Sequence, residues 1–378
     1  MTIQNVLVTG GAGYIGSHLV DELVSRGYEV TVLDNLEPQV HRSGTWPSYA
    51  NPRARYVRGD VRDRAVFEPL VLDAQAVVHF AAAVSIGQSM YQIDRYVDVN
   101  TRGTALLLDI LVNRPHRVEK LIVASSIGVY GEGAYECATC GPVAPTIRPE
   151  TQLAARDWEQ RCPVCHGHVR SVPTPESKPL WRDNIYSMTK YHQEEMVLLI
   201  GRTYGIPAVA ARFFNVYGPR QSLSNPYAGV AAIWLSRLLN GKPPVVFEDG
   251  GQLRDFVSIH DVVDCLVLML EHSGADYLPV NIGSGGTVTI LDIARLLKTL
   301  LDSPIEPLVT NTGRTFDIRH NTADISRARE TLGYAPKVSL DRGFAELIEW
   351  AKTTPDVAVD FFDAALEELQ QKGLLVKS

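Results

Sequence analysis

Residues 5–16 read Asn5-Val6-Leu7-Val8-Thr9-Gly10-Gly11-Ala12-Gly13-Tyr14-Ile15-Gly16, an apolar run followed at once by a glycine-rich loop. The run has the length of a buried strand, and the residues after the loop have helical spacing. Glycines lack a Cβ, so the backbone can turn tightly, approach a pyrophosphate and let the helix pack closely on the strand. The helix N-terminus then directs free N–H groups at phosphates. The predicted cofactor contacts here are Gly10, Gly13, Tyr14, Ile15 and Gly16.

Strand-length apolar runs alternate with helix-length amphipathic segments through the first half of the chain. This alternation predicts a Rossmann-like, doubly wound parallel sheet covered on both faces, in the α/β class. The expected strands are 5–9, 29–33, 76–80, 120–125 and 208–213, and the expected helices are 15–25, 65–70, 100–111 and 187–204. After Phe214, turn-forming residues divide the chain into shorter pieces, which predicts a smaller mixed α/β substrate domain.

The predicted domain boundaries follow from this change of pattern. We expect a cofactor-binding domain at 1–212 and 257–283, an inserted segment at 132–181, and a substrate-binding domain at 213–256 and 284–378. The tail after Pro355 carries apolar residues at helical spacing, including Val357, Phe361 and Leu369. This spacing predicts a helix that packs on its own domain, with a partner-binding helix as the alternative.

Composition and charge exclude several classes of protein. The 378 residues carry a net charge of −7 with no long basic run, which argues against nucleic acid as the main ligand. The sequence contains no uncharged apolar stretch of about 18 residues, so we expect no membrane span. No charged n-region and apolar h-region precede the first strand, so we expect a cytoplasmic protein. Its five cysteines are then more consistent with thiols or metal ligands than with disulfides.

An acidic residue at the end of the second strand bears on the choice of cofactor. Asp34 stands 18 residues after Gly16. A carboxylate at this position can accept hydrogen bonds from the ribose hydroxyls and would repel a 2′-phosphate, which favours NAD over NADP. His41 and Arg42 nearby weaken that preference slightly. The alternative for Asp34 is a solvated turn carboxylate.

Tyr186 and Lys190 form a Tyr-x-x-x-Lys pair one helical turn apart. Free tyrosine has a pKa of about 10 and is a poor base at neutral pH, but a nearby ammonium favours the phenolate. The spacing alone is common and mostly structural. It gains weight from Ser126, which ends a predicted strand and would face the ligand cleft of an open α/β sheet. The sequence therefore predicts a catalytic set of Ser126, Tyr186 and Lys190.

Ordered motifs along nearly the whole chain carry a family resemblance. They are residues 9–16, 33–36, 59–61, 79–82, 100–104, Ser125-Ser126 with 129–131, Tyr186 with Lys190, 212–219, 254–257 and 317–320. With these motifs the chain resembles the extended short-chain dehydrogenases/reductases, in their NAD-dependent nucleotide-sugar epimerase/dehydratase branch. The resemblance implies a nucleotide-diphosphate sugar as substrate and a homodimer that pairs the helices near 100–111 and 187–204.

The resemblance also implies roles for single residues. Asn100 would brace the active-site helix, and Arg254 and Arg314 would pair with the diphosphate, which a guanidinium binds through two oxygens at once. The implied further cofactor contacts are Asn35, Asp60, Val61, Ala81, Ala82, Asn100, Tyr186 and Lys190, of which Lys190 could hold the nicotinamide ribose. The implied substrate contacts are Ser85, Ser126, Asn215, Arg254 and Arg314, with 84–89 and 225–229 lining the sugar pocket.

The two residues after Ser126 narrow the reaction that the resemblance implies. Relatives that dehydrate or decarboxylate their sugar carry acidic groups there, whereas this chain has Ile127 and Gly128. Neither can transfer a proton, which favours simple 4-epimerisation, and Gly128 would leave room for the keto sugar to rotate. A dTDP-6-deoxyhexose is the favoured substrate. The alternatives are UDP-glucose or UDP-glucuronate 4-epimerisation, a 4,6-dehydratase and a 4-ketoreductase.

The segment between Ser126 and Tyr186 contains two Cys-x-x-Cys pairs, separated by 21 residues. Their spacing is typical of a closed tetrahedral zinc site, which predicts a zinc-knuckle insertion with a structural metal. The predicted ligands are Cys137, Cys140, Cys162 and Cys165, while Cys265 is expected to be a core residue. Zinc knuckles also bind nucleic acid, so a binding module without turnover is the alternative class. Residues 132–181 hold five Lys/Arg and six Asp/Glu, which argues against it.

Overall fold

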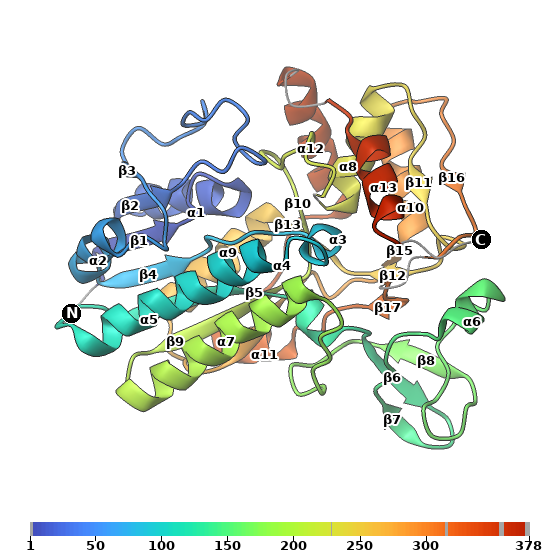
Figure 1. The fold of residues 1–378 in the computed structure, drawn as a ribbon, viewed down its shortest axis with the longest axis horizontal. Coiled ribbons are helices and arrows are strands. Elements are labelled where there is room, and N and C mark those ends of the chain that lie inside the picture. Colours follow the sequence, from blue (N-terminus) through green and yellow to red (C-terminus); the bar gives the residue numbers. More distant parts are fainter. Residues whose placement is uncertain (1–2, 228, 314–316, 355–358, 375–378) are drawn as a thin grey trace.

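A seven-stranded parallel sheet forms the centre of the protein (Figure 1). The computed structural model of the chain describes residues 3–227, 229–313, 317–354 and 359–374. In spatial order the strands are β3 (Arg55–Arg58), β2 (Glu29–Asp34), β1 (Asn5–Thr9), β4 (Ala76–His79), β5 (Lys120–Ser126), β9 (Ala208–Phe213) and β14 (Pro279–Ile282). The strand order reverses between β1 and β4, which is where open α/β sheets bind ligands. The predicted fold class is confirmed.

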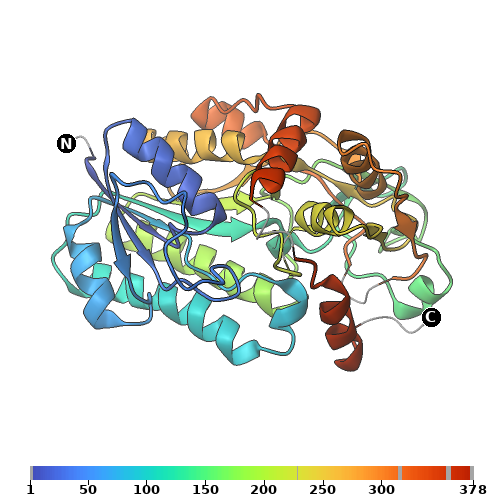
Figure 2. The same ribbon diagram turned by 90° about the horizontal axis from the view of Figure 1, so that it is seen from above.

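Helices cover both faces of this sheet, as Figure 2 shows from above. One face packs against α2 (Arg64–Asp73), α5 (Gly103–Asn113) and α7 (Ile185–Tyr204). The other packs against α1 (Tyr14–Ser25), α9 (Ile259–Glu271) and α11 (Ser326–Leu332). Alternate strand residues enter the two cores: Leu7 joins the first, and Val6 and Val8 join the second. Cys265 lies in the second core, as predicted.

The predicted strands agree with the structure to within a residue, but two edge strands were not predicted. β3 reads Arg-Tyr-Val-Arg, and its charged ends gave no apolar run. β14 begins at Pro279 and is only four residues long. The helix expected at 100–111 begins earlier, with α4 (Ile93–Tyr96) and a π-helical stretch at Val97–Arg102 ahead of α5.

A second lobe with its own core lies beyond the carboxyl ends of the strands (Figure 1). Its helices are α8 (Val230–Leu239), α10 (Ile290–Leu300) and α12 (Leu340–Thr353), and α13 (Phe362–Gln371) follows α12 in the chain. Its short sheets pair β10 (Asn215–Tyr217) with β13 (Phe256–Ser258), β11 (Val245–Val246) with β16 (Leu308–Val309), and β12 (Leu253–Arg254) with β15 (Val288–Thr289) and β17 (His320–Asn321). The mixed character of this lobe agrees with the prediction, while the domain boundaries themselves stay a prediction.

The inserted segment forms a small antiparallel sheet at one side of the second lobe (Figure 1). Its central strand is β6, flanked by β7 and β8, and α6 follows β7 in the chain. Their bounds are β6 (Ala134–Cys137), β7 (Gly141–Val143), α6 (Glu150–Ala154) and β8 (Val169–Val172). Among the described residues, no helix is both long and apolar enough to cross a membrane.

Candidate active site

A cavity of about 440 Å³ lies at the carboxyl ends of the central strands, between the sheet and the second lobe. Most of the residues predicted for the site line this cavity. Those lining it are Gly10, Gly13, Tyr14, Ile15, Gly16, Asp34, Asn35, Asp60, Val61, Ala81, Ala82, Ser126, Tyr186, Lys190 and Asn215. Ser85, Asn100 and Arg254 do not line it. Arg314 lies outside the described residues.

The glycine-rich loop has no room for side chains where it passes the sheet. Gly10 has φ +69°, and a Cβ there would come within 2.8 Å of the Ala81 nitrogen. A Cβ at Gly16 would lie 2.7 Å from the Gly11 Cα. Gly13 begins α1 and offers no side-chain cap, so the first helical N–H groups have no side-chain partner at the cavity wall. This combination suits a pyrophosphate.

The Asp34 carboxylate is fixed at the cavity wall by two backbone N–H groups. Its oxygens accept hydrogen bonds from Ala12, at 3.1 Å, and from Leu36, at 2.9 Å. Each carboxylate oxygen keeps a further lone pair. Asp34 can therefore accept hydrogen bonds from a ribose diol without moving, which is the role predicted for it.

Ser126 and Tyr186 both line the cavity, and their side chains share a hydrogen bond. Ser126 ends β5, and its Oγ accepts the Gly128 N–H at 3.1 Å, so its own proton is free to donate. Tyr186 lies in the first turn of α7, which begins where Asn184 accepts the Ser187 N–H. Burial raises the pKa of Tyr186, and the hydrogen bond with Ser126 acts in the opposite direction.

Lys190 stands one turn after Tyr186 but contacts a different group. Its ammonium donates to Gln193 Oε1 at 2.8 Å, and Gln193 donates onward to Thr104. Burial lowers the pKa of Lys190 to about 7. The sequence predicted that Lys190 would lower the pKa of Tyr186. In this arrangement the hydroxyl of Ser126 has that effect, because the ammonium is directed at Gln193.

Asn100 braces the cavity from behind. Its Oδ1 accepts the Ala83 N–H at 2.7 Å, and its Nδ2 donates to Ala83 O and to Thr189 Oγ1 on α7. Asn100 thus connects the loop after β4 to the helix that carries Tyr186. This is the bracing role that the family resemblance implied, although Asn100 does not itself reach the cavity.

A Ser126→Ala variant should need a higher pH for activity than the wild type. The Ser126 hydrogen bond lowers the pKa of Tyr186, so its loss raises that pKa and leaves more of the tyrosine protonated at any given pH. The acidic limb of the kcat/KM profile is therefore expected to move to higher pH. Ser126→Thr keeps a hydroxyl and should keep the profile. An unmoved limb in Ser126→Ala would contradict this assignment.

Two residues predicted for the substrate are placed differently from the expectation. Ser85 begins α3 (Ile86–Ser89) and accepts the Gln88 N–H, which makes it a helix cap. Arg254 is buried and donates to three backbone carbonyls, those of Leu253, Ile318 and Arg319. Burial lowers the pKa of Arg254. Its pairing with a diphosphate stays a prediction.

Gly128 has a packing role that the sequence did not reveal. A Cβ at this position would lie 2.7 Å from the Ser187 Oγ on α7. The glycine therefore lets the turn after β5 approach the helix of Tyr186 closely. Its neighbour Ile127 presents its side chain to the cavity wall.

Several residues that line the cavity were missed by the sequence analysis. The loop before α8 contributes Gln221 and Ser222 in addition to the predicted Asn225 and Tyr227, and α4 contributes Arg95. Gln221 follows the recognised motif at 212–219 by two residues, so its position could have drawn attention. Arg95 carries no sequence signal of its own.

The four cysteines of the insertion form one cluster. The Sγ atoms of Cys137, Cys140, Cys162 and Cys165 all lie within 4.8 Å of one another. Four thiolates around a zinc ion would be about 3.8 Å apart, given the usual zinc–sulfur distance. The turn at Cys162 is closed by hydrogen bonds to Gly167 O and from the His166 N–H, both at 2.9 Å. The donor set fits a closed structural metal site.

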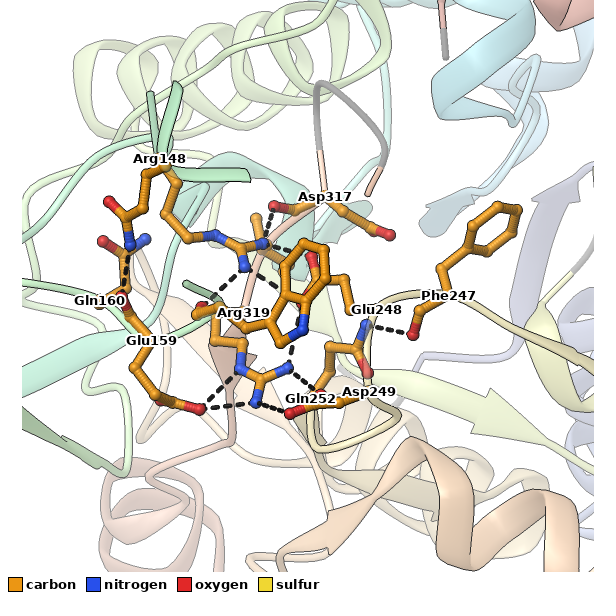
Figure 3. Close-up of polar contacts among 12 residues, drawn as sticks. Arg148, Glu159, Gln160, Phe247, Glu248, Asp249, Gln252, Asp317 and Arg319 are labelled. Carbon is orange, nitrogen blue, oxygen red and sulfur yellow. Dashed lines mark hydrogen bonds and ion pairs between the residues drawn. The ribbon is translucent and has the colours of Figure 1, made fainter. Parts of the chain in front are cut away.

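The insertion is joined to the second lobe by a buried network of charges (Figure 3). Arg148 of the insertion pairs with Glu248 at 2.7 Å, and both side chains are almost fully buried. Arg319 of the second lobe pairs with the same Glu248 and with Glu159 of the insertion. Glu132 accepts the Arg319 and His320 N–H groups. The insertion therefore fixes the segment of Ile318 and Arg319, whose backbone carbonyls accept hydrogen bonds from Arg254.

The doubly wound sheet, the glycine loop and the meeting of Ser126 with Tyr186 define a short-chain dehydrogenase/reductase of the extended type. The chain belongs to the NAD dependent epimerase/dehydratase family, whose profile matches residues 6–149 and 166–283. The unmatched stretch between them lies inside the insertion and includes Cys162 and Cys165.

Relatives with assigned activities include several epimerases. The chain is 37% identical to a dTDP-L-rhamnose 4-epimerase of Burkholderia thailandensis, over 92% of this chain and 94% of that one. It is similar to the UDP-glucose 4-epimerase of Thermotoga maritima, solved with UDP-glucose, at 32% identity and a TM-score of 0.76, over 93% of this chain and 100% of that one. The UDP-glucuronic acid 4-epimerase of Bacillus cereus, solved with UDP-glucuronic acid and NAD, gives 26% identity and a TM-score of 0.75, over 93% and 100% of the two chains.

Proposed function

We propose that this protein is an NAD-dependent nucleotide-sugar 4-epimerase. The observation that carries the proposal is the meeting of Ser126, Tyr186 and Lys190 in one cavity with the glycine loop and Asp34. The first three suit oxidation of an alcohol, and the last two suit a dinucleotide. NAD, when bound, supplies the hydride acceptor and donor at C4 of the sugar.

The chain's own residues handle the proton and the charge. Ser126 can donate a hydrogen bond to Tyr186 and so favour the phenolate that accepts the proton of the sugar 4-hydroxyl. After the keto sugar turns within the cavity, C4 is reduced on its opposite face and Tyr186 returns the proton to the 4-oxygen. The Asn215 Oδ1 is buried at the cavity wall and has no hydrogen-bond partner among the residues that the structure describes. It can accept a hydrogen bond from the sugar or the nucleotide.

The cavity wall beside Ser126 favours epimerisation over elimination of water or loss of carbon dioxide. Ile127 occupies the wall, and Gly128 carries no side chain. A dehydratase requires an acid and a base near C5 and C6 in addition to the tyrosine. A 4,6-dehydratase or a 4-ketoreductase is therefore the weaker alternative.

A neutral sugar, such as the 6-deoxyhexose of dTDP-L-rhamnose, is the substrate we favour. Lys190 and Arg95 are the cations among the described residues that line the cavity. Arg95 pairs with Glu37 at 3.1 Å, and Lys190 is bound to Gln193. A glucuronate carboxylate would compete for an ammonium or guanidinium that already has a partner. UDP-glucose and UDP-glucuronate remain as alternative substrates.

We further propose that the cysteine cluster holds a structural zinc ion and that the protein is a homodimer. Closed by four thiolates, such a zinc site has no open position for catalysis. For the dimer, α7 exposes Met188, Leu199 and Tyr204, of which Leu199 is 57% exposed. Met188 and Leu199 lie on the same face of α7, and exposed apolar residues there are suited to helix pairing between subunits, which sedimentation would measure.

Turnover in D₂O with dTDP-L-rhamnose, UDP-glucose and UDP-glucuronate, followed by NMR, tests the proposed reaction. We expect a 4-epimer of one of them, with the original hydrogen retained at C4, because it leaves and returns as hydride. A 4,6-dehydratase would instead move the C4 hydrogen to C6 and place solvent deuterium at C5. Absence of turnover with every nucleotide sugar, together with tight RNA binding, would favour the binding-module alternative.

A further inference from the structure

The C-terminal helix α13 lies across the boundary between the two halves of the protein rather than on one of them. In both views α13 lies beside α3 and α8 (Figures 1 and 2). This differs from the expectation that it would pack on its own domain. Its contacts come from both sides of the cavity, and one of them reaches a residue of the cavity wall, Tyr227.

On the side of the second lobe, α13 is held by ion pairs. Arg237 at the end of α8 pairs with Asp363 at 2.6 Å and with Asp360 at 3.4 Å. Lys242 pairs with the same two carboxylates, with Asp360 at 3.0 Å and with Asp363 at 2.9 Å. Both Arg237 and Asp360 are largely buried, with exposed side-chain fractions of 6% and 4%. The start of α13 is therefore fixed to the second lobe.

On the side of the sheet, α13 is held by apolar and cation–π contacts. Leu369 lies directly over Gly87, where an added Cβ would come within 2.9 Å of the leucine methyl group. The Arg42 guanidinium stacks over the Phe361 ring at 4.7 Å. Glycine at position 87 thus provides the space that the helix occupies, and α13 connects the two halves.

A chain of hydrogen bonds leads from α13 to the cavity wall. The Tyr227 hydroxyl donates to Glu368 Oε2 at 2.7 Å. Tyr91, from the segment between α3 and α4, shares a hydrogen bond of 2.9 Å with the same hydroxyl. A second bridge joins the same two sides, where Gln39 donates to Asn225 at 3.3 Å. The side chains of Asn225 and Tyr227 are thereby held over the cavity.

We propose that α13 is a clamp on the sugar end of the cavity, with Glu368 as a positioning residue that holds Tyr227 against the bound nucleotide sugar. The identity of the occupant rests on the proposed function, while the clamp rests on the contacts alone. The Glu368 carboxylate fixes the hydroxyl of Tyr227, and its ring then forms a constant part of the cavity wall. Closing this end also keeps the keto sugar from leaving between its oxidation and its reduction.

Glu368→Ala, Glu368→Gln and Glu367→Ala, in the full-length protein loaded with NAD, test the clamp. Glu367 is the exposed neighbour of Glu368 and serves as the matched control. A hydrogen bond to a carboxylate is strong, so Glu368→Ala should weaken nucleotide-sugar binding by about tenfold or more. The affinity for NAD should be unchanged. Glu368→Gln keeps an acceptor oxygen and should restore most of the sugar affinity.

Amide hydrogen exchange gives a readout that is independent of the substrate. Exchange at residues 221–227 should increase in Glu368→Ala and not in Glu367→Ala. If this increase is seen while the wild type converts no nucleotide sugar, the proposed function fails and the clamp stands. Wild-type exchange and wild-type sugar affinity in Glu368→Ala would overturn the clamp, as would an equal loss of NAD and sugar binding.

Discussion

Replacing Tyr186 with phenylalanine is expected to lower kcat by about 10² to 10⁴-fold, the usual contribution of a positioned acid–base group. The variant keeps the half-buried ring in the first turn of α7 and loses only the hydroxyl that meets Ser126. The fold should be preserved, because phenylalanine fills the same volume without leaving a cavity. Rates of C4 epimerisation, measured with the substrate identified by NMR, test this expectation.

Tyr191→Phe is the matched control for this loss. Tyr191 lies on the same helix, and its ring stacks with the Arg182 guanidinium at 4.3 Å, a contact that phenylalanine retains. The control should turn over as the wild type does, and both variants should bind NAD with unchanged affinity. If Tyr186→Phe retained more than about a tenth of the wild-type kcat, the assignment of the proton-transfer group would have to be abandoned.

The second large effect is expected at the cysteine cluster. Cys162→Ser should abolish binding of the proposed zinc ion, because the Cys162 Sγ is one of four that lie within 4.8 Å of one another. Zinc binding to small structural sites contributes on the order of 10 kcal/mol of folding free energy at neutral pH. Residues 132–181 should therefore become sensitive to proteases, and the melting temperature should fall. Metal content by mass spectrometry and limited proteolysis measure both changes.

His168→Ala separates loss of metal from loss of a nearby polar side chain. His168 is exposed and lies in the same insertion, but it does not belong to the four-thiol cluster. This variant should keep its zinc and its resistance to proteolysis. Wild-type protein that contains no metal, together with an unchanged melting temperature in Cys162→Ser, would contradict the structural zinc site.

The parallel sheet and the position of the cavity could be predicted from the sequence because their signals are local. The strand β1 and the glycine loop that follows it are adjacent in the chain, and the strand ends place Asp34 and Ser126 at one edge of the sheet. The edge strands β3 and β14 were missed for the opposite reason. An edge strand can be short, charged or begin with proline, and it then lacks an apolar run.

Contacts between distant segments could not be predicted. The apolar spacing of α13 predicts a buried face but not which surface it meets, and Glu368 reaches Tyr227 only through the fold. The family resemblance predicted a diphosphate as the partner of Arg254, and nothing in the sequence indicated the three backbone carbonyls to which it donates in the structure. Lys190 likewise donates to Gln193, one turn further along the same helix. Tyr186 and Gln193 lie at similar spacing on either side of Lys190, so spacing alone could not show which of them the ammonium contacts.

The ion pair between Arg148 and Glu248 limits how the insertion can be gained or lost by a protein of this fold. The Glu248 side chain has 0% exposure. If the insertion were removed, Arg319 would be the one guanidinium among the described residues that still pairs with Glu248. The negative charge of the buried Glu248 carboxylate would then be only partly compensated. Grafting the insertion onto a protein of this fold that lacks an acid at the position of Glu248 would bury an arginine without a partner. Transfer of the insertion therefore requires an acidic residue at position 248, on the far side of the interface.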